Sequence, residues 1–345
     1  MAQLKYWNGS AWVDYKKKPK YWNGSQWVSG IGKVWNGSAW VDLLSYYSYF
    51  GSWASTYSYS NLYKVSSTGS QVWQVRWTFQ GIRDVKVDPN GYIYTASGDG
   101  AAVRKISPSG SLVWRFVGST GYGANGVAVG SDGYVYSANS DGTVRKITPN
   151  GGQVWCFTDP DRTFYAVAVD INNYVYAGCS NYTKAIRKIS PSGGEVWALS
   201  RSSFGSDVVV DAQGNVYCSS GSLYKVSSSG SVLWEFTNAS GSPTVGPGGY
   251  VYASGSSGLI AKISPSGSQV WGYTDPNSSS VISLTVDPYG YIYYCPYAGA
   301  PSSSTVYCYY KISPSGVRLW TFVVAEGEGY VAVDPGVLGA FPSYW

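Results

Sequence analysis

A repeated segment constrains the fold of this chain more than any other feature of its sequence. The second half of the segment, K-I-S-P-S-G-S-x-V-W with variations, occurs seven times and closes on a tryptophan at intervals of 37 to 49 residues. This interval is the length of a four-stranded blade, so the pattern predicts a β-propeller. We expect the seven tryptophans to pack between neighbouring blades; they are Trp73, Trp114, Trp155, Trp197, Trp234, Trp271 and Trp320.

Each copy divides into four short strands separated by turn residues. In the copy that closes on Trp155, the predicted strands are residues 127–129, 134–137, 144–147 and 154–157, where β-branched and aromatic residues alternate with others. Asp-Pro-Asn-Gly turns join strands one and two, and Ser-Pro-Ser-Gly turns join strands three and four.

The two ends of the repeat region are complementary. The first copy begins within a blade, at residues 62–65 and 71–75, and the last ends just after a strand-one signature at residues 331–334. Strands from both ends would complete one shared blade and remove the open sheet edges. We therefore predict that residues 44–345 form an all-β, seven-bladed propeller with a composite closing blade. The alternative is an open solenoid.

A second repeat, W-N-G-S-x-W-V, occurs three times within residues 1–43. Asn-Gly between β-forming residues predicts a hairpin with a two-residue turn. That turn would set Trp7 against Ser10 and Lys5 against Trp12, which places Trp7 and Trp12 diagonally on one face. We assign assembly to the six hairpin tryptophans, Trp7, Trp12, Trp22, Trp27, Trp35 and Trp40. A single hairpin is marginal in water, so we expect these to dock onto a partner; the alternative is a self-packed appendage.

Composition argues against several functional classes. The chain has no histidine, which removes imidazole zinc sites and Ser-His-Asp or Cys-His catalysis. Its net charge of +5 comes largely from lysines 16–18 and 20, so we expect no nucleic-acid binding. The N-terminus lacks the apolar core of a signal peptide, and no segment is long and apolar enough for a membrane helix. The five cysteines leave the redox compartment open.

The loops between strands two and three and the connections between blades vary among copies, whereas the two kinds of turn change little. We infer that the varied face, here called the loop face, serves recognition; the alternative is drift in loop length. Tyrosine, asparagine and scattered charges suit adaptable binding and sugars in particular. The candidate ligand-binding residues are Tyr122, Asn125, Asp159, Asp161, Arg162, Tyr165, Tyr182, Arg201, Phe204, Tyr273, Asp275 and Tyr297.

From the sequence we assign no residue to a catalytic or metal site. The aspartates that begin the one-two turns could line a channel, but such residues usually accept backbone N–H groups. Asp159, Asp161 and Asp275 could supply paired acids for glycoside hydrolysis, although the sequence gives no separation between them. We expect no cofactor and no metal.

Cys295 and Cys308 flank the longest loop of the repeat region. Alignment with the copy that closes on Trp155 sets Cys295 at the place of Ala138 and Cys308 at that of Thr143. We expect the two cysteines to face each other across a hairpin, where a disulfide could form; the alternative is a pair of free thiols.

Several families resemble parts of this chain. Val-Ala-Val-Asp at residues 167–170 resembles the NHL and gluconolactonase-type repeat, and K-I-S-P-S-G-x-x-V-W resembles the repeat of quinoprotein (PQQ-type) propellers. The quinoprotein A-x-D-x-x-T-G-x-x-x-W signature is not intact. The tandem W-N-G-S-x-W-V units resemble segments of tailed-bacteriophage virion proteins, which implies attachment of the N-terminal part to the particle.

Together these features predict a phage-tail structural protein rather than an enzyme. Its hairpins would dock to other tail proteins and its loop face would bind the host surface, with a glycan as the expected partner. We expect assembly in the host cytoplasm, location in the virion and a homo-oligomer, a trimer. The alternatives are a glycan-active enzyme and a cellular lectin or scaffold, and a capsid-surface fibre is a variant of the leading hypothesis.

Overall fold

Two compact units make up the chain, Met1–Ser45 and Tyr46–Trp345. In the first unit, the computed structural model describes six three-residue strands. In the second it describes residues 47–53, 60–78, 81–100, 102–118, 121–160, 162–179, 184–200, 207–276, 278–297, 307–324 and 328–333. The described residues hold no helix long and apolar enough to cross a membrane.

The first unit consists of three antiparallel strand pairs: β1 (Lys5–Trp7) with β2 (Trp12–Asp14), β3 (Lys20–Trp22) with β4 (Trp27–Ser29), and β5 (Lys33–Trp35) with β6 (Trp40–Asp42). Trp7 lies directly opposite Trp12, and Lys5 opposite Asp14. The predicted two-residue turn and diagonal tryptophans are therefore wrong. Four residues separate the two strands of each pair.

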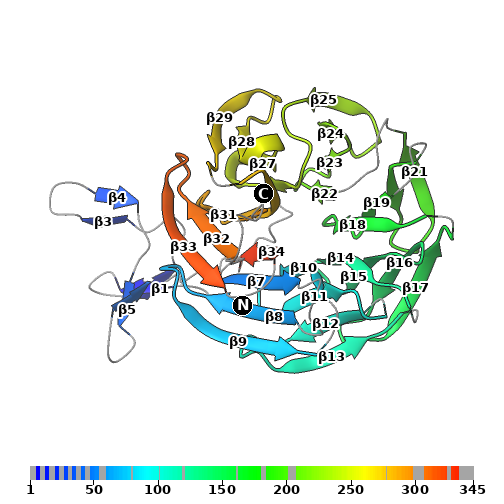
Figure 1. Cartoon of the computed structure of the whole chain (residues 1–345), viewed down its shortest axis with the longest axis horizontal. Helices are drawn as coiled ribbons and strands as arrows, with labels where there is room; N and C mark the ends of the chain where they lie inside the picture. The colour runs from blue at the N-terminus through cyan, green and yellow to red at the C-terminus, as the bar shows by residue number, and fades with distance from the viewer. Residues whose placement is uncertain are drawn as a thin grey trace. The chain divides into compact units, whose positions relative to one another are not determined.

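The second unit contains seven four-stranded antiparallel sheets arranged in a ring (Figure 1). Six of them, blades 1 to 6, are continuous in sequence. Their strands are β10 (Ile82–Val87), β11 (Ile93–Ser97), β12 (Ala102–Ile106) and β13 (Leu112–Phe116) in blade 1; β14 (Ala124–Val129), β15 (Val135–Asn139), β16 (Thr143–Ile147) and β17 (Gln153–Thr158) in blade 2; β18 (Phe164–Val169), β19 (Val175–Cys179), β20 (Ile186–Ile189) and β21 (Glu195–Leu199) in blade 3; β22 (Asp207–Val210), β23 (Val216–Ser219), β24 (Leu223–Val226) and β25 (Val232–Phe236) in blade 4; β26 (Pro243–Val245), β27 (Val251–Ser254), β28 (Leu259–Ile263) and β29 (Gln269–Thr274) in blade 5; and β30 (Ser280–Val286), β31 (Ile292–Tyr297), β32 (Tyr307–Ile312) and β33 (Arg318–Val324) in blade 6. Two short 3-10 turns, η1 (Pro247–Gly249) and η2 (Ser256–Gly258), lie in blade 5.

The closing blade combines both ends of the propeller. Its strand order is β34 (Glu328–Val333), β7 (Ser48–Trp53), β8 (Ser60–Val65) and β9 (Gln71–Trp77). The C-terminal strand β34 pairs with β7, and Figure 1 shows the two side by side. The prediction of a seven-bladed propeller with a composite closing blade is confirmed.

The repeated motif encodes a packing unit that recurs in each blade. In blade 2 the Tyr136 and Trp155 rings lie 6.1 Å apart, and the Lys146 ammonium lies 4.4 Å from the centre of the Tyr134 ring. The one-two turn of blade 3 is held by Asp170, which accepts hydrogen bonds from backbone N–H groups two and four residues later and from the Tyr176 hydroxyl. These aspartates therefore act as turn residues.

The seven repeat tryptophans also join the blades. Each indole Nε1–H donates a hydrogen bond of 2.8–3.1 Å to a backbone carbonyl in the three-four turn of the next blade. The series closes where Trp320 of blade 6 donates to Ser67 of the closing blade. Every blade is thus tied to its neighbour by the same bond.

Cys295 and Cys308 are not joined by a disulfide in this structure. The reason lies in the register of the two strands. In blade 2, Ala138 pairs with Val144, one residue away from the Thr143 position used in the alignment. The pairing of Tyr294 with Tyr310 in blade 6 shows the same offset. A one-residue shift turns a side chain to the opposite face of the sheet.

Candidate functional site: the central channel

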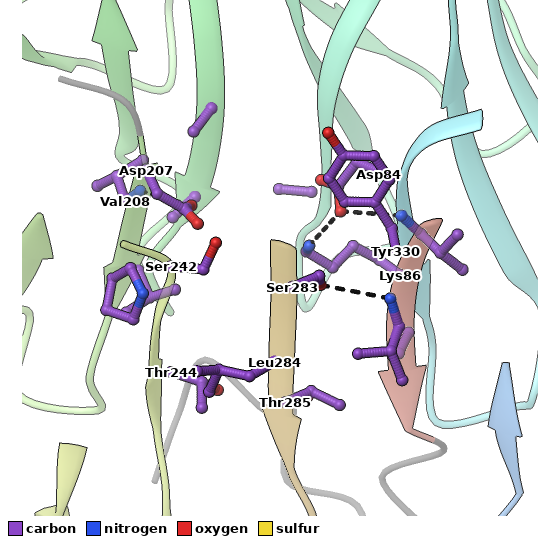
Figure 2. A pocket seen from close by; sticks show the side chains of 18 of the residues that line it. Asp84, Lys86, Asp207, Val208, Ser242, Thr244, Ser283, Leu284, Thr285 and Tyr330 are labelled. Carbon is purple, nitrogen blue, oxygen red and sulfur yellow. Dashed lines mark hydrogen bonds and ion pairs between the residues drawn. The ribbon is translucent and has the colours of Figure 1, made fainter. Parts of the chain in front are cut away.

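The first strands of all seven blades surround a central cavity of about 590 Å³. Figure 2 shows its side chains facing one another across an open space, with Asp207 and Ser242 on one wall and Asp84, Lys86 and Tyr330 on the other. Pockets of this size commonly hold small ligands. The channel is therefore the candidate site with the best-defined geometry.

Strand register places the channel residues in two rings. Each residue of the deeper ring pairs with the repeat tyrosine of strand two, and these residues are Lys86, Ala128, Ala168, Val209, Thr244, Thr285 and Ala332. Two residues earlier along the chain in each blade, nearer the loop face, lies the outer ring. Its members are Asp84, Gly126, Ala166, Asp207, Ser242, Ser283 and Tyr330.

The outer ring is polar on one side only. Blades 4, 5, 6, the closing blade and blade 1 contribute a contiguous polar arc, consisting of Asp207, Ser242, Ser283, Tyr330 and Asp84. Blades 2 and 3 contribute Gly126 and Ala166 instead. Space explains the glycine, because a Cβ atom there would lie 3.0 Å from the Tyr165 carbonyl oxygen.

Three members of the polar arc bond to the main chain of a neighbouring blade. Asp84 accepts a 3.0 Å hydrogen bond from the N–H of Val127, and Ser283 accepts one of 3.3 Å from the N–H of Val331. The Ser242 hydroxyl donates to the Ile282 carbonyl at 3.3 Å. These bonds satisfy backbone groups on the inner edges of the first strands.

Charge is partly compensated within the channel. Asp84 forms an ion pair with Lys86 at 2.7 Å. Burial raises the pKa of Asp207 to about 6, and the Asp84 carboxylate adds to the rise, while Lys86 and the nearby Ser242 hydroxyl oppose it. Burial and the two carboxylates raise the pKa of Tyr330 to about 12, so its phenol stays a neutral donor. The raised pKa therefore brings the protonation change of Asp207 close to neutral pH.

At the mouth of the channel three residues from successive blades are connected. Arg83 donates a 2.6 Å hydrogen bond to the Asn125 side chain, whose amide in turn donates to the Phe164 carbonyl at 2.8 Å. The next residue, Tyr165, lies at a β-bulge and is 40% exposed while lining the cavity. Two predicted site residues, Asn125 and Tyr165, therefore both lie at the channel mouth.

Other predicted loop-face residues have structural partners. Asp159 forms an ion pair with Arg187, which also bonds Glu195 at 2.6 Å. The Asp275 side chain is fully buried, where it pairs with Arg318 at 3.1 Å and accepts a 2.8 Å hydrogen bond from Tyr294. Ligand contact by either aspartate stays a prediction.

The remaining predicted residues are dispersed. Tyr122 is 51% exposed, the Arg162 N–H donates to the Asp159 carbonyl at 3.2 Å, and the Tyr273 ring packs edge-on against Tyr294. The side chain of Tyr297 is not described. Four further candidates lie outside the described residues: Asp161, Tyr182, Arg201 and Phe204.

The polar arc was not singled out from the sequence. A signal was available, because blade 3 carries Ala-Val-Ala-Val on its first strand whereas the equivalent segment of blade 1 is Asp-Val-Lys-Val. The first strand of the composite blade, with Tyr330, is recognised only once the ring is closed. Among the described residues no group of three or more acidic or cysteine side chains could hold a metal ion.

Two successive matches to one family model cover most of the propeller. The family is described as outer membrane protein assembly factor BamB (PQQ_2), and the matches span residues 59–182 and 182–292. The chain belongs to this family. Membership in the BamB family agrees with the resemblance of the K-I-S-P-S-G-x-x-V-W half-repeat to quinoprotein-type propellers. No curated protein sequence matches this BamB-family chain significantly.

Solved structures show the same fold at low identity. A Bacteroides caccae protein of unknown function is 13% identical with a TM-score of 0.54, covering 84% of this chain and 98% of its own. Virginiamycin B lyase from Staphylococcus aureus is 14% identical with a TM-score of 0.60, covering 70% and 84%. A streptogramin B lyase is 13% identical with a TM-score of 0.60, covering 81% and 87%. At these identities the likeness shows the fold alone.

Proposed function

We propose that this BamB-family chain is an attachment protein of a phage tail, whose hairpins dock to the particle and whose loop face binds a glycan on the host surface. Three tandem W-N-G-S-x-W-V units support the docking half, and each forms a ladder with paired tryptophans. Two-stranded hairpins of this size have little stability alone, so packing against other tail proteins would stabilise them.

The observation that carries the binding half is the channel mouth. There an exposed tyrosine, Tyr165, lies beside the hydrogen-bonded pair of Arg83 and Asn125, at the opening of a cavity. Rigid aromatic surface next to fixed polar groups is typical of recognition sites. Because these residues sit on the first strands and their connections, the ring of blades holds them in place.

How the described acids are used also favours binding over catalysis. Asp170 and its equivalents in other blades hold turns, and Asp141, Asp159 and Asp275 pair with arginines within the propeller. A general acid or base has to reach the reacting atoms of its substrate. Acids engaged in this way serve the fold, and Asp207, which lines the channel, is the exception among the described acids discussed above.

The family description favours a second candidate, an assembly factor that uses the propeller as a scaffold for other proteins. The two candidates differ in location. A tail protein copurifies with infectious particles at a fixed copy number, whereas an assembly factor stays with the host envelope. Mass spectrometry of purified virions distinguishes them, and absence of the chain from particles would contradict the tail proposal.

A truncation tests whether the hairpins serve docking and the propeller folds without them. The fragment 46–345 retains every strand of the propeller, including β34 and β7, so we expect it to fold with the thermal stability of the propeller in the full chain. It should fail to enter particles. Light scattering on the full chain and on the fragment tests the proposed trimer. We expect the full chain to be trimeric and the fragment monomeric; a trimeric fragment would contradict the role of the hairpins in oligomerisation.

A further inference from the structure

We propose that the polar arc of the channel binds a single sugar unit, which enters from the loop face with its hydroxyls toward Asp207, Tyr330 and Asp84. This inference deepens the glycan-binding part of the proposed function and rests on it. It assigns recognition to the interior of the channel, whereas the loop tips would only guide the glycan to the mouth.

The distribution of polar residues around the ring supports a binding site. Equivalent positions in blades 2 and 3 hold Gly126 and Ala166, so the repeat needs no polar side chain there. Polar residues nevertheless fill five successive blades on the other side. In the deeper ring, too, no polar residue comes from blade 2 or 3, since the polar members Lys86, Thr244 and Thr285 belong to blades 1, 5 and 6.

Packing between blades explains only part of this arc. Asp84, Ser242 and Ser283 bond to the main chain of a neighbouring blade. Asp207 instead accepts a hydrogen bond from the N–H of Val208 on its own strand. Figure 2 shows its carboxyl group turned toward the open space of the channel, across from the wall that carries Tyr330. These two side chains are the members of the arc that a ligand can use without breaking a bond to the main chain of another blade.

The chemistry of the channel favours a neutral, hydroxyl-rich ligand. Lys86 compensates the charge of Asp84, and the Arg83 guanidinium bonds Asn125, which leaves Asp207 as the channel acid that no ion pair engages among the described residues. A carboxylate accepts strong hydrogen bonds from hydroxyl groups, and a phenol can donate one. The side of the channel formed by blades 2 and 3 is apolar and ends in the exposed ring of Tyr165, against which the C–H face of a sugar can pack.

The test uses the full chain and methyl glycosides of common hexoses and N-acetylhexosamines as probes. Saturation-transfer NMR identifies the glycosides that bind, and calorimetry then measures the tightest of them on four variants. Asp207→Asn and Tyr330→Phe change the arc with little change in volume. Asp132→Asn alters an exposed acid on the opposite face, and Tyr122→Ala alters the loop face outside the channel.

We expect Asp207→Asn to weaken binding about tenfold or more, because it removes a charged acceptor, and Tyr330→Phe to weaken it severalfold. Asp132→Asn, the control on the opposite face, should bind like the unchanged chain, and Tyr122→Ala shows whether the loop face contributes to binding. The proposal is wrong if no glycoside binds, or if binding survives both channel variants and is lost in Tyr122→Ala. If Asp207→Asn does not fold, Tyr330→Phe decides alone.

The outcome is separable from that of the proposed function. A chain present in virions without channel-dependent glycoside binding would overturn this inference only. Channel-dependent binding by a chain that is absent from virions would overturn the tail assignment only.

Discussion

Each three-four turn holds a glycine against the repeat tryptophan of the preceding blade. In blade 3 this residue is Gly193, whose φ is +95°, and a Cβ atom added there would lie 3.2 Å from the Trp155 ring. The neighbouring Gly194 has no atom closer than 3.6 Å to such a Cβ. Other copies carry side chains at the position of Gly194, namely Ser70, Ser111, Ser231, Ser268 and Val317, whereas all seven have glycine at the first position.

Replacing Gly193 by alanine should therefore destabilise the propeller by about 2 kcal/mol. An L-residue at positive φ costs roughly 1–2 kcal/mol, and crowding of the indole adds about 1 kcal/mol. Lower freedom of the unfolded chain offsets roughly 0.5 kcal/mol of this cost. Gly194→Ala should change the free energy of unfolding by no more than about 0.5 kcal/mol.

Urea unfolding of both variants, followed by tryptophan fluorescence, measures the difference. We expect Gly193→Ala to lower the midpoint with the same dependence on urea concentration, because the folded surface is unchanged. Equal midpoints for the two variants would refute the argument that the indole and the positive φ together require glycine.

Three further predictions concern single side chains. Trp155→Phe should cost about 1–2 kcal/mol in urea unfolding, since the Pro191 carbonyl loses its 2.9 Å hydrogen bond; an unchanged midpoint would show that this bond contributes nothing. Because the pKa of Asp207 is raised in the folded state, the folded protein binds a proton at this carboxyl more tightly than the unfolded chain does. The stabilising effect of protonated Asp207 is therefore complete below pH 3.8 and is lost as pH rises through about 6. Stability of Asp207→Asn relative to the unchanged chain should therefore rise by roughly 1 kcal/mol per pH unit across that window, and a flat difference would contradict the shift. Asp275→Asn should cost roughly 2 kcal/mol because it breaks a pair with the partly exposed Arg318, and a double-mutant cycle with Arg318→Met should show coupling between the two.

The repeat made the architecture predictable because its information is local. A Val-x-Val strand, an Asp-Pro-x-Gly turn and a closing tryptophan each act within one blade, and seven copies with complementary ends leave a closed ring as the economical solution. The same periodicity gave the positions of the tryptophans, whose partners lie one blade further on. Register was less accessible, since a shift of two residues misplaced the hairpin tryptophans and a shift of one residue misplaced the pair of Cys295 and Cys308.

Which residues line the channel together depends on the tertiary structure. Asp84, Asp207 and Tyr330 lie far apart in the sequence and meet only because seven first strands converge on one axis. Likewise, nothing local distinguishes Asp275, paired with Arg318 43 residues away, from Asp207, whose carboxyl group faces the cavity. A side chain's type is fixed by the sequence, but its partners depend on which blade lies beside it, and those partners determine whether a charged group supports the fold or faces a ligand.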